Sequence, residues 1–222
     1  MNWTLSDDPP ADGRTNMARD RELLSSNAAV GRVYSWDGPW VSLGQFQNHE
    51  RDLIDPTVPW VMRPTGGKAV LHGHDVTVAL AAPLSAFGLE EREVKLAYRA
   101  LAQPLIDALN ACGLPTELAE RTRFSGRGPR TSDCFAHISP NDMVDPVSGL
   151  KRCGSALRIA GGSILMQASI PVGQPLIDPS RVFATPHIPS TTVWDSDRLA
   201  EALREQLQSI DATAPIPMPL HP

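Results

Sequence analysis

The sequence lacks any long hydrophobic run. No stretch of about 18 consecutive apolar residues occurs in the chain, so no membrane-spanning helix is expected. The first residues, MNWTLSDDPPADG, contain no basic segment followed by an apolar one, and no secretory leader is expected there. These two absences predict a cytoplasmic protein with no membrane partner.

Positive charge is also scarce. Lys and Arg together number 20 against 25 Asp and Glu, which gives a formal net charge of −5 over 222 residues. An acidic balance of this kind argues against a nucleic-acid partner. Apolar residues make up 41% of the chain, so it is expected to fold around a core rather than remain disordered.

Cysteine is rare, and the three cysteines have neither CxxC nor metal-ligand spacing. This predicts reduced thiols. Cys112 lies on the apolar stripe of an expected helix and should belong to the core. Cys153 is expected to be buried in a strand, although it shares a strand face with Lys151 and could instead border a site. Cys134 follows a run of arginines, and positive charge favours the reactive thiolate, whereas Asp133 beside it opposes this.

Internal repeats and Gly/Ser linkers are absent as well, so residues 1–211 are predicted to form a single domain. Residues 212–222 (ATAPIPMPLHP) have a proline at nearly every second or third position. Such a segment cannot hold a helix and is predicted to be an extended or disordered tail.

Apolar spacing predicts three helices, over 15–26, 94–112 and 197–209. Asp195 or Ser196 is the expected cap of the third helix. Pro104 predicts a kink or a break in the second helix.

Strand-like runs lie before and after the long helix instead of alternating with helices. The runs at 33–36 and 40–43 flank Asp37-Gly38, a good hairpin turn. The others are 60–63, 68–71, 76–82, 142–144, 150–159 and 163–171, and residues 160–162 join the last pair by a turn. This order predicts the α+β class, with a mixed, largely antiparallel sheet packed against helices.

Two segments have the character of ligand sites. In RPTGGKAVLH (63–72), Gly66-Gly67 would let the backbone approach a ligand, and Arg63 and Lys68 add positive charge. The spacing does not match a phosphate-binding P-loop, and a plain hairpin turn is the alternative. In the second segment, the small residues 154–156 follow Lys151 and leave room for a ligand, or simply for packing of sheet against helix.

A metal site is not expected. His72, His74 and Asp75 are the only potential ligands that occur together, and no distant Cys/His pair completes the set.

Taken together, the segments resemble the biotin/lipoate A/B protein ligase family and occur in its order. Residues 16–20 look like its first helix, and residues 32–36 followed by 41–47 look like its opening hairpin. Residues 63–72 resemble its acyl-binding loop, and Lys151 with Gly154-Ser155-Ala156 resembles its lysine segment. The resemblance covers about residues 3–210 and implies the catalytic-domain fold of that family.

Cys134-Phe135 resembles the cysteine-dependent octanoyltransferase and lipoyl amidotransferase branch, because members similar to ATP-dependent lipoate ligases lack this cysteine. The resemblance implies that Cys134 accepts an octanoyl or lipoyl group from an acyl carrier protein. The group then passes to the lysine of a lipoyl domain such as the glycine cleavage H protein, and no cofactor is required. Lys151 would activate the thiol and bind the thioester carbonyl. With a pKa lowered by burial, it would also shuttle a proton. The substrate-binding residues implied are Trp36, Arg63, Thr65, Gly66, Gly67, Lys68, His72, Gly154, Ser155 and Ala156.

Two other functions stay open. The chain could be an ATP-dependent lipoate-protein ligase, or a non-catalytic relative that only binds an acyl carrier or a lipoyl domain. The basic run Arg121, Arg123, Arg127 and Arg130 could dock acidic carrier domains or be a solvated loop. The residues indicate no particular oligomeric state.

Overall fold

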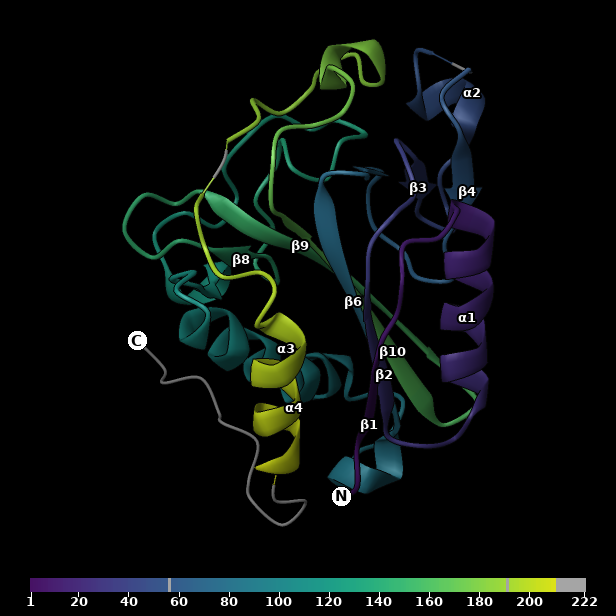
Figure 1. Cartoon of the computed structure of the whole chain (residues 1–222), viewed down its shortest axis with the longest axis vertical. Coiled ribbons are helices and arrows are strands. Elements are labelled where there is room, and N and C mark those ends of the chain that lie inside the picture. Colours follow the sequence, from purple (N-terminus) through teal and green to yellow (C-terminus); the bar gives the residue numbers. More distant parts are fainter. Residues whose placement is uncertain (56, 191, 211–222) are drawn as a thin grey trace.

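A seven-stranded sheet forms the centre of the molecule (Figure 1). The computed structural model describes residues 1–55, 57–190 and 192–210, so the expected tail over 212–222 lies outside the described residues. In spatial order the strands are β1 (Thr4–Asp7), β2 (Val30–Tyr34), β6 (Asp75–Pro83), β10 (Ser163–Pro171), β9 (Lys151–Ala160), β8 (Met143–Val144) and β7 (Glu117–Leu118). Within this sheet, as far as the chain is described, β1 and β2 are parallel and every other neighbouring pair is antiparallel. The predicted α+β class is therefore confirmed.

A smaller sheet has the order β4 (Trp60–Met62), β3 (Val41–Leu43) and β5 (Val70–Leu71). The hairpin predicted around Asp37-Gly38 is wrong, because β2 pairs with β6 in the main sheet and β3 pairs with β4 and β5. Both edges of β2 are occupied, by β1 and β6, so no edge was left for β3. The turn instead connects the two sheets.

The helices are α1 (Gly13–Ser25), the short α2 (His49–Asp52), α3 (Val94–Ala111) and α4 (Leu199–Gln208). Single turns of 3-10 helix occur at Leu84–Phe87, Ala119–Arg121 and Pro179–Arg181. The side chain of Asp12 caps the N-terminus of α1. Arg198 stands at the N-cap position of α4, so neither Asp195 nor Ser196, the two caps predicted for this helix, is found there. In the part of the chain that is described, no helix has the length and apolarity to cross a bilayer.

Pro104 does not break α3, which is helical from Val94 to Ala111. A proline removes one backbone hydrogen bond from the helix. The helix nevertheless continues because its apolar face, which includes Leu101, Leu105 and Leu109, is buried against the sheet.

Helices cover both faces of the main sheet (Figure 1). The helices α3 and α4 pack on one face, and α1 packs on the other. The central strand β6 sends Val78 and Leu80 into the first layer and Ala79 and Ala81 into the second. This is why that segment is apolar at successive positions rather than at alternate ones.

The layer under α3 and α4 also contains two of the thiols. Cys112 is 3% exposed and Cys153 is fully buried. The predicted burial of both cysteines is confirmed.

Candidate active site

The side chain of Arg63 organises the loop between β4 and β5. Its Nη2 donates to the carbonyl oxygens of Gly66 (2.6 Å) and Lys68 (2.7 Å), and its Nη1 donates to that of Ser42 (2.9 Å). Gly67 adopts a φ of +86°, and a Cβ added there would lie 3.1 Å from the guanidinium. Because β4 and β5 do not pair with each other, this segment is an organised loop and not a hairpin turn. Burial lowers the pKa of Arg63 to about 10.

A series of buried hydrogen bonds runs from Ser42, which contacts Arg63, through His72 to Asp75. The Oγ of Ser42 lies 2.8 Å from Nε2 of His72, and Nδ1 of His72 lies 2.7 Å from the carboxylate of Asp75. Burial opposes ionisation of Asp75, but the attraction and hydrogen bond of His72, with the hydrogen bond of Ser169, together outweigh it and lower the pKa of this carboxyl. Trp36 stacks on His72 with ring centroids 3.9 Å apart. His72 therefore has both ring nitrogens engaged within the protein.

The backbone around Cys134 is attached to the same loop. The N–H of Cys134 donates to the carbonyl of Ala69 at 2.8 Å. The buried carboxylate of Asp133 accepts the N–H groups of Phe135 (2.9 Å) and His187 (2.8 Å). Asp133 thus stabilises the turn that carries the thiol.

Lys151, the first residue of β9, holds its ammonium against Cys134. The Nζ–Sγ distance is 3.4 Å. The same Nζ lies 2.6 Å from the carbonyl oxygen of Cys134, 3.1 Å from that of His137 and 2.8 Å from the carboxylate of Asp142. Since an ammonium has three N–H groups, the three oxygen contacts can use all of them.

The charge state of Lys151 differs from the expectation. Burial alone would lower its pKa, but the sulfur of Cys134 and the carboxylate of Asp142 together raise it above the ordinary lysine value. The condition for a proton shuttle on Lys151, a pKa lowered by burial, is therefore not met. Two negative partners outweigh burial: the sulfur of Cys134 first, and then Asp142, a buried carboxylate that belongs to no motif in the sequence.

Small residues of β9 make room beside the thiol. A Cβ added at Gly154 would lie 3.0 Å from the sulfur of Cys134. The hydroxyl of Ser155 lies 2.7 Å from that of Tyr98. The side chain of Ala156 faces Gly67 across the cavity, 3.5 Å from where a Cβ of Gly67 would stand.

These elements line an open cavity whose empty space, part of it continuous with solvent, is about 400 Å³. Of the predicted site residues, those that line it are Trp36, Arg63, Gly67, Lys68, His72, Cys134, Gly154, Ser155 and Ala156. Thr65, Gly66 and Lys151 are not among the lining residues, although Lys151 contacts the sulfur of the lining residue Cys134. Lining residues that sequence reasoning missed are Met17, Tyr34, Ser42, Val70, Thr77, Gln167, Ala168 and Ser169. The polar Gln167 and Ser169, two residues apart in an apolar strand, were the available signal.

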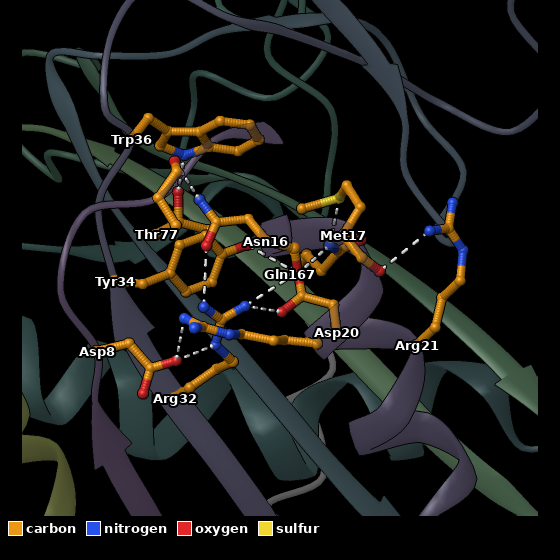
Figure 2. Close-up of polar contacts among 12 residues, drawn as sticks. Asp8, Asn16, Met17, Asp20, Arg21, Arg32, Tyr34, Trp36, Thr77 and Gln167 are labelled. Atoms are coloured by element: carbon orange, nitrogen blue, oxygen red, sulfur yellow. Dashed lines mark hydrogen bonds and ion pairs between the residues drawn. The ribbon is translucent and has the colours of Figure 1, made fainter. Parts of the chain in front are cut away.

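A buried network connects α1 to the loop (Figure 2). Asp20 pairs with Arg32 at 2.8 Å and accepts the hydroxyl of Tyr34 at 2.7 Å and the amide of Gln167 at 2.5 Å. Gln167 in turn accepts the hydroxyl of Thr65 at 2.6 Å. Burial raises the pKa of Asp20 in spite of these partners. The network therefore connects the loop that contains Thr65 to α1 through buried hydrogen bonds.

We expect Arg32→Met to lower the free energy of unfolding by about 3–5 kcal/mol, because it leaves the carboxylate of Asp20 buried without its ion pair. Urea unfolding monitored by fluorescence measures the change. Arg19→Met is the matched control. Its side chain is 41% exposed and pairs with Asp8 at 3.4 Å, so its loss should cost less than about 1 kcal/mol. Equal stabilities of the two variants would contradict this account.

Comparison with known proteins gives a consistent result. Residues 12–215 match the family described as Lipoyl protein ligase A/B catalytic domain. A relative from Kyrpidia tusciae, Octanoyltransferase LipM, is 30% identical over 229 residues, which cover 97% of this chain and 81% of the relative. Octanoyltransferase LipM of Moorella thermoacetica is 31% identical over 205 residues, with coverages of 86% and 71%.

Solved structures agree on the fold. One describes an archaeal lipoylation system, a bi-partite lipoate protein ligase and its E2 lipoyl domain from Thermoplasma acidophilum. It aligns with a TM-score of 0.61 at 19% identity over 95% of this chain and 74% of that chain. Lipoate-protein ligase A bound with ATP aligns with a TM-score of 0.69 at 19% identity, over 94% of this chain and 86% of that one.

Proposed function

Because the chain belongs to the lipoyl protein ligase A/B catalytic domain family, we propose that it is an octanoyltransferase of lipoate biosynthesis that works through an acyl-enzyme on Cys134. The 3.4 Å contact between its sulfur and the ammonium of Lys151, at the edge of the cavity, is the main support. The octanoyltransferase relatives support the choice of acyl group.

The first step forms the acyl-enzyme. The thiolate of Cys134 attacks the carbonyl carbon of an octanoyl thioester, and the carbonyl electron pair moves onto oxygen. When that pair returns, the bond to the carrier sulfur breaks, and the carrier leaves as a thiolate that takes a proton from solvent. Lys151 stabilises the attacking thiolate by its fixed positive charge, since its raised pKa keeps it an ammonium.

The second step transfers the acyl group. The neutral amine of a lysine on a lipoyl domain attacks the thioester carbonyl of the acyl-enzyme. An amide bond forms, the sulfur of Cys134 leaves as a thiolate, and the proton lost by nitrogen passes to solvent. An amide is more stable than a thioester, so the transfer needs no ATP.

We assign the carrier contacts to the exposed arginines Arg121, Arg123, Arg127 and Arg130. The guanidinium groups of Arg123 and Arg127 lie over Phe124, at 5.2 and 4.8 Å from the ring centroid. Positive charge held on a rigid ring suits an acidic acyl carrier protein or an acidic lipoyl domain such as the H protein.

The test uses the whole chain and needs no cofactor. Incubation with octanoyl-acyl carrier protein should add one octanoyl group to the protein, visible by intact mass. Addition of a lipoyl domain with an unmodified lysine should then move that group to the domain without ATP. Modification of the domain only with lipoate and ATP would instead indicate a ligase. Absence of product with either donor would indicate a non-catalytic binding protein.

A further inference from the structure

Among the residues that the structure describes, none is a hydrogen-bond partner of the ammonium of Lys68, a lysine that lines the cavity. The chain contains three lysines, Lys68, Lys95 and Lys151. The Nζ of Lys68 is shielded from solvent and meets no acceptor within the described parts of the chain, although the residue lines the same cavity as Cys134. A shielded ammonium without an acceptor is unfavourable, so this position favours a ligand that brings an oxygen.

The N–H groups of the other two cations near the thiol already donate to oxygen atoms of the protein. Lys151 directs its ammonium to the oxygens of Cys134, His137 and Asp142. Arg63 directs its guanidinium to oxygens of its own loop and of Ser42. Neither group has an N–H group left for a thioester carbonyl.

The backbone fixes Lys68 close to the nucleophile. Its carbonyl oxygen accepts Nη2 of Arg63 at 2.7 Å. The next residue, Ala69, forms a bridge with Asp133, in which its N–H donates to Ser132 and its carbonyl accepts the N–H of Cys134, both at 2.8 Å. Lys68 is therefore one residue away from a segment that is hydrogen-bonded directly to the thiol's own turn.

We propose that the ammonium of Lys68 donates a hydrogen bond to the thioester carbonyl oxygen and stabilises the oxyanion that forms there in both transfer steps. This inference rests on the proposed function and names a further catalytic residue for it. As sulfur or nitrogen attacks, the carbonyl pair becomes negative charge on oxygen, next to Lys68. When the pair returns and the leaving group departs, Lys68 keeps its proton. A hydrogen-bond donor interacts more strongly with the oxygen once negative charge develops on it. Such a donor lowers the activation barrier more than it strengthens substrate binding.

The charged environment of Lys68 gives this role a pH signature. Burial lowers its pKa, Cys134 and the carboxylates of Asp133 and Asp142 oppose that change, and Lys151 reinforces it; the net direction is down. The pKa of Lys151 is raised instead. A loss of acylation at a pH below the ordinary lysine range therefore belongs to Lys68 and not to Lys151.

The test compares two reactions of the same thiol. Single-turnover acylation by octanoyl-pantetheine should be about 10²–10³-fold slower in Lys68→Met, as for the loss of an oxyanion donor. Alkylation by iodoacetamide forms no oxyanion, so it should slow by less than about 10-fold. Lys95→Met, which removes an exposed lysine of α3, should leave both rates unchanged.

A second variant covers a loss of folding in Lys68→Met. Lys68→Arg keeps the charge and should move the alkaline decline of acylation to higher pH, because guanidinium titrates above an amine. Unchanged acylation in Lys68→Met, an equal loss of acylation and alkylation, or an unmoved alkaline limb in Lys68→Arg would overturn the inference. If the unmodified protein itself gains no octanoyl group on Cys134, the proposed function fails instead.

Discussion

Replacement of Cys134 by alanine should abolish formation of the octanoyl-enzyme and lower the rate of octanoyl transfer by at least about 10⁴-fold. The reason is that the variant lacks the sulfur atom to which the acyl group bonds. Intact mass after incubation with octanoyl-acyl carrier protein measures the first effect. The rate of octanoylation of a lipoyl domain measures the second. The substitution removes a small, half-buried side chain at a cavity edge, so the fold should persist.

The other two thiols are matched controls. Burial raises the pKa of Cys112 and of Cys153 above the ordinary thiol value, so both are protonated at neutral pH. Cys112→Ser and Cys153→Ser should each cost about 1–3 kcal/mol of unfolding free energy, from a hydroxyl placed in the core, and leave acylation intact. An acylated Cys134→Ala protein would refute the assignment. So would a folded but inactive Cys112→Ser protein.

Removal of the ammonium of Lys151 should affect both acylation and alkylation of Cys134. In Lys151→Met, acylation of Cys134 should fall by about 10²–10³-fold, since the positive charge 3.4 Å from the sulfur is lost. Alkylation by iodoacetamide at neutral pH should fall with it, because this charge acts on the thiolate itself. Parallel stopped-flow measurements of the two reactions provide the check.

Stability must be separated from chemistry in this variant. Lys151→Met leaves the carboxylate of Asp142 buried without its ion pair, which costs about 3–5 kcal/mol. The double variant Lys151→Met/Asp142→Asn removes that charge and should regain most of the stability without regaining the rate. If the double variant acylates at the normal rate, Lys151 has only a structural role.

The sequence was sufficient for the fold class because its long strands are internally consistent. β9 and β10 are joined at residues 160–162 as predicted, and the apolar run of β6 reflects helices on both faces. It was insufficient at Asp37-Gly38, since a good turn also fits a link between two sheets. The edge strand β1 was missed altogether, because it is only four residues long and mostly exposed.

For the candidate site too, some features could be predicted from the sequence and others could not. Local motifs located Arg63, Lys68, Cys134 and Lys151, and the structure brings these residues around one cavity. The roles of their partners depend on contacts between segments far apart in sequence. Asp142 belongs to no motif, yet together with the sulfur of Cys134 it raises the pKa of Lys151.

The bridge between Ala69 and Asp133 has a mechanical consequence. Its two hydrogen bonds, each 2.8 Å long, make the glycine loop and the turn of Cys134 parts of one ladder. A bound acyl chain that displaces the glycine loop would therefore also displace the backbone of Cys134 and its sulfur. We therefore expect acyl chains that displace the loop to react slowly even where they bind tightly, because the attacking sulfur is moved out of line with the carbonyl carbon.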